Sequence, residues 1–134
     1  MFEIDPAFLA TSHALGDLEL CHARLQDDAR YPWIVLIPRV EGARELEDLS
    51  REQLAALMDE TLLAGRMVRA VGTGVEKLNV GALGNVTPQL HVHVVGRRDG
   101  DPAWPGPVWG HSPAQPYGAE DLARAMERLA PLLA

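Results

Sequence analysis

The sequence predicts an α+β fold in which an antiparallel sheet is flanked by helices. Short apolar or alternating runs predict strands at 18–25, 33–37, 77–82 and 89–95. Only the short turn 26–32 separates the first two strands, which favours an antiparallel hairpin. Amphipathic helices before, between and after paired strands are typical of an α+β domain rather than of an alternating α/β fold.

The N-terminal third combines one short helix with the predicted hairpin. Asp5-Pro6 predicts a helix start, because aspartate caps a helix and proline suits its first position. Phe8, Leu9 and Leu15 would form its apolar face, and Gly16-Asp17 would end it. The run Trp33–Ile37 is continuously apolar and ends at a proline, which predicts a strand buried on both faces.

The middle of the chain carries the clearest helix signal. Ser50 and Gln53 have the spacing of a capping box, which predicts a helix start at Ser50. Apolar residues then recur at helical spacing, and they predict one face packed on the core. These residues are Leu54, Leu57, Met58, Leu62, Met67 and Val68.

The C-terminal part alternates strand and loop signals before a last helix. Residues 77–82 predict a strand, 83–88 a loop, and 89–95 a strand with strict alternation. Residues 99–118 are rich in glycine and proline and predict an ordered surface segment, followed by an amphipathic helix at 120–129. Because no repeat or linker interrupts the chain, residues 1–134 are expected to form one domain.

Composition narrows the classes of partner. The chain has 134 residues, enough to bury a core, and a formal net charge of −7 from 12 basic and 19 acidic residues. An acidic protein has no general attraction to nucleic acid or anionic membranes, so neither is expected as a partner. No leader-like or bilayer-length apolar run is found, and we expect a cytoplasmic protein. The single cysteine, Cys21, excludes an intrachain disulfide and predicts a buried thiol.

Polar side chains with nitrogen atoms gather on the last predicted strand. Residues two apart on a strand share a face, so Gln89, His91 and His93 would point one way. The apolar residues between them would point into the core. The alternation by itself also fits a half-exposed strand without a functional role.

Two chemical interpretations fit this pattern. A His-x-His pair can bind zinc if a third ligand approaches, and the candidates His13, His22, His111 and Glu41 are scattered through the chain. Alternatively, a neutral imidazole can attack a phosphorus atom, provided that donors surround the phosphate. The preceding loop offers Gly84, Asn85 and Thr87 as phosphate-binding candidates, and the preceding strand offers Asn79.

The segment Gln89–Val95 resembles the histidine-triad (HIT) signature His-φ-His-φ-His-φ-φ, where φ is apolar. Its context is also similar to that of the HIT family, at Trp33–Pro38, Asn79, Gly84, Gly96-Arg97 and Trp104-Pro105. The resemblance implies an α+β homodimer whose sheets join and which binds nucleotides.

The resemblance also implies roles for individual residues. His91 would attack an α-phosphate, His93 would hold phosphate oxygens, and Asn79 would lie near the phosphate or ribose. The family mechanism implies neither a metal nor any other cofactor for the covalent step in many members.

The sequence departs from the family pattern at several positions. Gln89 replaces the first histidine and cannot supply a proton to a leaving group as an imidazolium could. Val86 stands where the family usually has Ser or Thr, although Thr87 is adjacent. Glu41 lies near where some members have a further histidine. Arg97 and Arg98 could contact a phosphate, but solvated surface positions are expected for both.

Together these observations predict a homodimer that binds a purine nucleotide and acts at its α-phosphate. The substrate would be a phosphoramidate or a dinucleoside polyphosphate, the intermediate a nucleotidyl-His91, and Gln89 would orient His91 or the leaving group. Two alternatives stay open: a catalytically weak nucleotide-binding sensor, and a metal-dependent His-x-His hydrolase. Trp104 and Trp109 would cover the site or pack in the core or interface.

Overall fold

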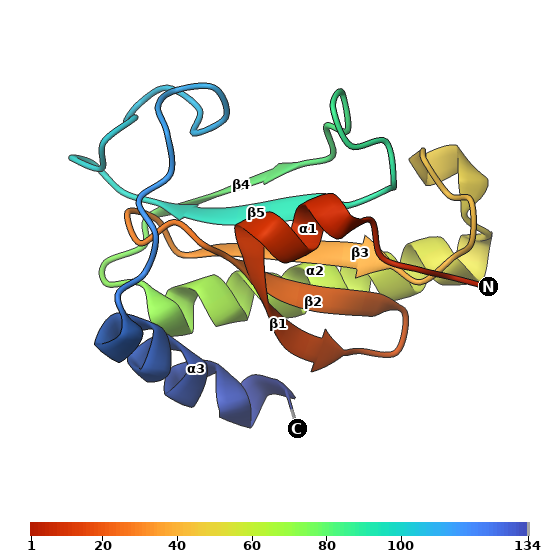
Figure 1. Cartoon of the computed structure of the whole chain (residues 1–134), viewed down its shortest axis with the longest axis horizontal. Helices are drawn as coiled ribbons and strands as arrows, with labels where there is room; N and C mark the ends of the chain where they lie inside the picture. Colours follow the sequence, from red (N-terminus) through yellow and green to blue (C-terminus); the bar gives the residue numbers. More distant parts are fainter. Residues whose placement is uncertain (134) are drawn as a thin grey trace.

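The computed structural model describes residues 1–133 and confirms the predicted α+β fold (Figure 1). Five strands form one antiparallel sheet in the order β1-β2-β3-β5-β4. The elements are α1 (Pro6–Thr11), β1 (Ser12–Asp17), β2 (Cys21–Gln26), β3 (Trp33–Pro38), a 3-10 turn (Leu46–Asp48), α2 (Arg51–Val71), β4 (Lys77–Gly81), β5 (Val92–Arg97) and α3 (Ala119–Leu133).

Strand β3 lies at the centre of the sheet, and all six of its residues are buried, as the apolar run predicts. Ile34 and Leu36 pack in the larger core beneath α2. Trp33, Val35 and Ile37 pack on the opposite face, together with Phe8 of α1. Helices therefore cover both faces of the sheet, α1 on one side and α2 on the other (Figure 1).

Helix α2 begins as predicted but buries a different face. Ser50 and Gln53 form the reciprocal capping box. Leu57, Met67 and Val68 are buried, whereas the predicted core residues Leu54, Met58 and Leu62 are 39%, 59% and 58% exposed. Part of the buried face is instead made of small residues and Glu60, whose carboxylate accepts hydrogen bonds from the Leu20 and Cys21 amides.

The N-terminal prediction is half right. Asp5 caps α1 by accepting from the Ala7 amide, and Pro6 occupies the first turn. The predicted apolar face of the helix is wrong, because α1 ends at Thr11 and Leu15 lies in strand β1, which the sequence analysis missed. Leu9 is exposed. Pairing with β2 fixes β1, and local composition gives little sign of it.

Two strand boundaries also differ from the prediction. β2 begins at Cys21 rather than at residue 18, because 18–20 form the turn from β1 and the Leu18 amide bonds to the Cys21 carbonyl. β5 covers 92–97 rather than 89–95. Residues 89–91 lie outside the ladder, and there the Leu90 amide donates to the carbonyl of Ala43.

The segment 99–118 contains no helix or strand and packs back onto the turn after β2. The Ala29 amide donates to the Gln115 carbonyl, and the Tyr117 amide donates to the Asp27 carboxylate. α3 then runs from Ala119, four residues longer at its C-terminal end than predicted. Within residues 1–133, no helix combines the length and the apolar character that crossing a bilayer requires.

Candidate functional site

His91 is the most constrained of the predicted site residues. It lies just before β5, is 7% exposed, and its Nδ1 is 2.7 Å from the Gln89 carbonyl oxygen. A carbonyl can only accept, so Nδ1 carries the hydrogen and Nε2 carries a lone pair when the ring is neutral. Phe8 of α1 packs edge-on against the ring at 4.8 Å between centroids. The fold therefore fixes both the tautomer and the ring plane of His91.

His93 is held in the opposite tautomer. The Trp33 indole Nε1 donates to His93 Nδ1 at 3.0 Å, so the imidazole hydrogen lies on Nε2. Burial, and then the charge of His91 nearby, lower the pKa of His93 to about 4. The two imidazoles are 4.9 Å apart between centroids. At neutral pH, His93 is thus a neutral hydrogen-bond donor through Nε2, and its ring lies next to that of His91.

The side chain of Gln89 holds the N-terminal segment. Its Oε1 accepts from the Asp5 amide at 2.8 Å, and its Nε2 donates to the Glu3 carbonyl at 2.7 Å. Because β5 begins only at Val92, Gln89 and His91 lie before the strand and not on it, where the sequence analysis predicted them. Gln89 reaches His91 through its backbone carbonyl instead.

A pocket of about 250 Å³ lies against His91. The pocket lies between the loop after β4 and the segment before α2. Gly84 lines it and has φ +83°, in the left-handed region that favours glycine. The lining residues are Arg44, Glu45, Leu46, Glu47, Ala82, Leu83, Gly84, Pro88, Gln89, Leu90 and His91. Of the predicted site residues, the pocket gathers His91, Gln89 and Gly84.

The other predicted site residues lie outside this pocket. Asn79 accepts from Arg97 Nη1 through its Oδ1 at 2.8 Å. Asn85 is exposed and Thr87 is half-buried in the loop. His93 contacts the rings of Trp33 and Trp109 and does not line this pocket.

Several neighbours of the histidines went unrecognised in the sequence. Phe8 contacts His91, and Trp33 contacts His93. In each pair the two residues are 60 or more positions apart in the sequence. Trp109 packs 5.6 Å from His93 between ring centroids and lies against Gly81, where a Cβ atom would be 3.3 Å from the indole. Of the predicted roles for Trp109, core packing describes its position, because it packs against the core cluster around Trp33 and does not line the His91 pocket. Arg44 brings a cation to the pocket, and no local motif marks it.

The expectation that Arg97 is solvated is wrong. Its side chain is 1% exposed, and its guanidinium binds the Asp101 carboxylate through Nε at 2.7 Å and Nη2 at 2.9 Å. The pair is buried beneath Trp104, which lies 5.7 Å from the Arg97 guanidinium. Arg98 is exposed, as expected.

The scattered metal-ligand candidates do not converge. Within residues 1–133, no three His, Cys, Asp or Glu side chains form a group that could hold a metal ion. The candidates have other partners: His13 contacts Asp27, His22 contacts Asp17, His111 contacts Ser112, and Glu41 binds the N-terminal amine.

An α+β sheet with two adjacent histidines in opposite tautomers, one of them beside a glycine-containing loop, defines a class of site seen in nucleotide-binding proteins of the histidine-triad type. The model of the HIT domain family matches residues 8–100, and the chain belongs to this family. Its members are generally nucleotide-binding hydrolases or transferases.

Solved structures agree over nearly the whole chain. A histidine-triad protein from Marinobacter aquaeolei VT8 is 44% identical, covering 99% of this chain and 96% of that one, with a TM-score of 0.91. Proteins of the same description from Sinorhizobium meliloti 1021 and Bradyrhizobium japonicum are 41% and 37% identical, cover 99% of this chain and 98% of theirs, and have TM-scores of 0.92 and 0.94. A comparison with curated protein sequences gives no match.

Proposed function

We propose that this protein cleaves or transfers nucleotidyl groups at an α-phosphate through a covalent intermediate on His91 Nε2. The observation that carries the proposal is the hydrogen bond from His91 Nδ1 to the Gln89 carbonyl. It leaves the Nε2 lone pair available and stabilises the positive ring that forms when that lone pair attacks. The substrate would be a phosphoramidate or a dinucleoside polyphosphate with a purine base.

The reaction proceeds in two displacements. Nε2 forms a bond to the α-phosphorus while the bond to the leaving group breaks, and the leaving group keeps that electron pair. Water then attacks the phosphorus and the P–N bond breaks. Nucleoside monophosphate leaves, and solvent takes up the proton that the attacking water loses. His93 Nε2–H and backbone amides near Gly84 would donate to the phosphoryl oxygens, and Asn79, Asn85 and Thr87 stay candidates for substrate contacts.

Gln89 is proposed to position rather than to transfer a proton. An amide has no acidic proton to give at neutral pH, and both ends of this amide are engaged by the N-terminal segment. The leaving group must therefore depart as an anion or take its proton from water. Substrates with acidic leaving groups should react fastest.

The deciding experiment follows AMP release by chromatography, with chelator present. Wild type and His91→Ala are incubated with an adenosine phosphoramidate and with several dinucleoside polyphosphates. Release by wild type and not by His91→Ala supports the proposal, and a nucleotidyl adduct trapped on His91 in acid-quenched enzyme would locate the bond. Activity that chelator abolishes and zinc restores would contradict it.

A nucleotide-binding module without turnover is the second candidate. The engagement of the Gln89 amide by the N-terminal segment favours it, because no proton donor then replaces the first histidine of the family pattern. AMP binding by calorimetry, with no release from any substrate at high enzyme concentration, would select this alternative.

We also propose that residues 1–134 form a single HIT domain that assembles as a homodimer. An apolar groove of about 360 Å³ runs between α2 and β4, and it includes Leu54, Met58 and Val80. β4 is at one edge of the sheet, so its outer backbone groups lack a strand partner within the described residues. A second copy that joins its own β4 and α2 here would bury both features. The cytoplasmic location stays a prediction from the sequence.

A further inference from the structure

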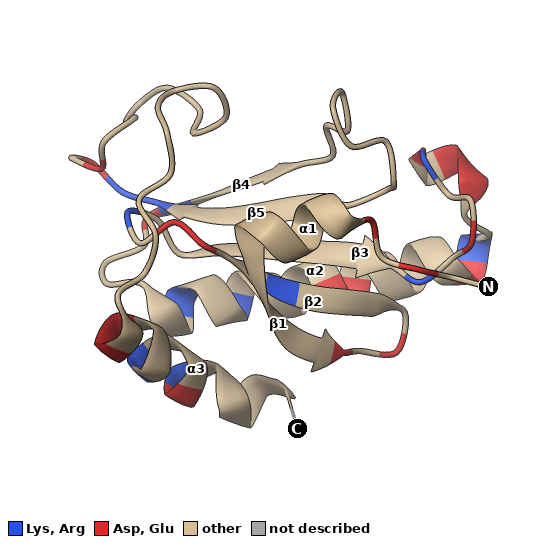
Figure 2. Cartoon of the chain, in the orientation of Figure 1, with Lys and Arg blue, Asp and Glu red and all other residues tan. Residues whose placement is uncertain are grey.

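A second pocket lies at the opposite end of β5 from His91. It has a volume of about 290 Å³ and is bounded by the end of β5, the loop after α2 and the first turns of α3. It shares no lining residue with the His91 pocket. Its walls contain five of the twelve basic residues of the chain: Arg30, Arg97, Arg98, Arg124 and Arg128. Figure 2 shows basic segments of β5, α2 and α3 at this end of the molecule.

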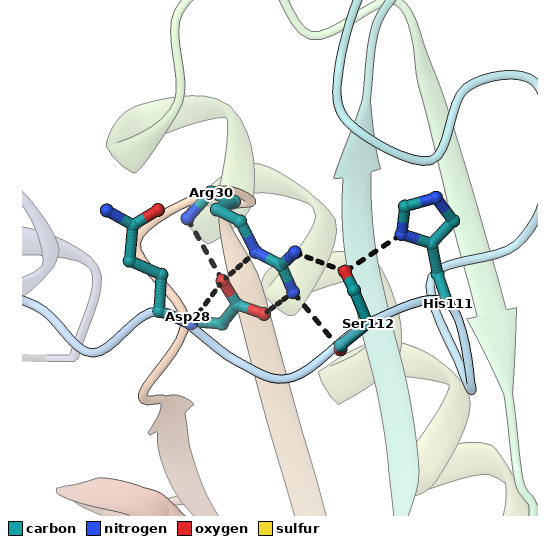
Figure 3. Close-up of polar contacts among 5 residues, drawn as sticks. Asp28, Arg30, His111 and Ser112 are labelled. Carbon is teal, nitrogen blue, oxygen red and sulfur yellow. Dashed lines mark hydrogen bonds and ion pairs between the residues drawn. The ribbon is translucent and has the colours of Figure 1, made fainter.

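Three of these arginines already have carboxylate partners. Arg97 binds Asp101, and Arg124 binds Asp121. Arg30 binds Asp28 through Nε and Nη2 and also donates to Ser112, which in turn contacts His111 (Figure 3). This network ties the turn after β2 to the segment before α3, next to the Arg30 wall of the pocket.

Arg98 and Arg128 are left without a carboxylate partner. Within residues 1–133, the Arg98 side chain makes no hydrogen bond or ion pair, and that of Arg128 makes only a 3.4 Å contact with the Val71 carbonyl. Both side chains are exposed and line the same hollow. The pocket therefore carries excess positive charge on a protein whose formal net charge is −7.

The remaining walls show the kind of ligand that would fit. Pro32, Val71 and Val75 supply apolar surface, and Thr73 and Tyr117 supply hydroxyl groups. Burial raises the pKa of Tyr117 to about 12, so its hydroxyl keeps the proton at neutral pH. The volume is near the lower end of the ~300–1,000 Å³ of small-molecule pockets. Guanidinium groups match the oxygens of phosphate in paired hydrogen bonds.

We propose that this pocket binds a small phosphate-bearing molecule through Arg98 and Arg128. This site is separate from the His91 pocket, and the proposal does not depend on the proposed nucleotidyl reaction. A concave site of this size favours a small ligand over a nucleic-acid strand, which the acidic surface elsewhere would repel.

The test is titration calorimetry of the whole protein with inorganic pyrophosphate at low salt. We expect saturable binding that weakens at least about tenfold in the double variant Arg98→Ala/Arg128→Ala, because two charge-assisted contacts are lost. The matched control is Arg51→Ala/Arg66→Ala, which removes the same charge from exposed positions on α2. Circular dichroism establishes folding, and Arg98→Ala alone is the second variant because its side chain has no partner to lose.

Three results would overturn the proposal. The first is no saturable binding to wild type. The second is binding that the double variant keeps while His91→Ala loses it, which would place the pyrophosphate in the other pocket. The third is tighter binding of a single-stranded RNA oligomer that is sensitive to the same two substitutions. AMP release by Arg98→Ala/Arg128→Ala should equal that of wild type, so failure here is distinguishable from failure of the nucleotidyl proposal.

Discussion

At the residue scale, Gln89 has two structural roles, one for its backbone and one for its side chain. Its backbone carbonyl fixes the tautomer of His91, while its side chain closes onto the backbone of Glu3 and Asp5. That closure places α1 so that Phe8 packs on the His91 ring. A glutamine at this position therefore orders the wall of the site and leaves proton transfer to solvent.

Replacing Gln89 with alanine tests this positioning role. Two neutral, partly exposed hydrogen bonds are lost, so the free energy of unfolding should fall by about 2 kcal/mol. AMP release should decline by less than about a hundredfold, because the carbonyl that orients His91 remains. Chemical denaturation and kcat for AMP release provide the two readouts.

The matched control is Gln26→Ala, since Gln26 is half-buried and its side chain makes no hydrogen bond within residues 1–133. It should change both quantities little. A Gln89→Ala protein of unchanged stability that is as inactive as His91→Ala would show that the glutamine acts chemically, against our interpretation.

His93 makes stability depend on pH. In the folded protein, burial and the neighbouring His91 lower the pKa of His93 from 6.5 to about 4, so between these values the unfolded chain binds the extra proton. The protein should therefore have its full stability with respect to His93 above about pH 6.5. The free energy of unfolding should fall by about 3 kcal/mol as the pH drops toward 4.

Urea denaturation from pH 4 to 7 measures this loss, with His93→Gln as the comparison. Glutamine does not titrate, so the variant should have a shallower pH profile, whatever its stability at pH 7. An identical slope for the two proteins would assign the acid sensitivity to other groups.

At the element scale, β5 shows what alternation can and cannot predict. Leu90, Val92 and Val94 are all buried in the same core, as the pattern indicates. Strand pairing with β3 nevertheless stops at Val92, and the Leu90 amide bonds to Ala43 instead. Side-chain alternation reports burial and does not report the partner of each backbone group, which is why the start of the strand was misplaced.

Gly96 shows why β5 needs a residue without a side chain near its end. A Cβ atom there would be 2.8 Å from Pro32 Cγ and 3.1 Å from a Val75 methyl. Gly96→Ala should therefore lower the free energy of unfolding by about 1–3 kcal/mol, because the ring of Pro32 can shift only slightly to relieve the overlap. Gly118→Ala is the control, since a Cβ atom there meets nothing within 4 Å. Equal stability of both variants by denaturant titration would show that the loop at Pro32 moves aside freely.

At the scale of the whole molecule, the contacts that build the site are long-range. Trp33 meets His93 across 60 positions, and Gln89 meets Glu3 across 86. Sequence patterns predicted the motif around His91, the helices and the central strand because those signals are local. They could not predict which distant segment would cover each histidine.

The exposed face of α2 has a similar explanation. Leu54, Met58 and Leu62 follow the helical period of a buried face, yet they lie on the surface of the isolated chain. A stripe that packs against a second copy has the same pattern as one that packs on its own core. The error in the predicted core is thus the observation that supports a dimer.

Met58→Glu should separate this dimer into monomers. The substitution places a charge in the apolar groove between α2 and β4, where an interface would bury that charge without a partner. Light scattering at micromolar concentration should give a dimer mass for wild type and a monomer mass for Met58→Glu. Leu9→Glu is the matched control, because Leu9 is equally exposed at 60% but lies on α1, away from the groove. The Leu9→Glu variant should remain a dimer. A monomer mass for wild type, or a dimer that survives Met58→Glu, would refute the interface and leave the exposed stripe without the partner we assign to it.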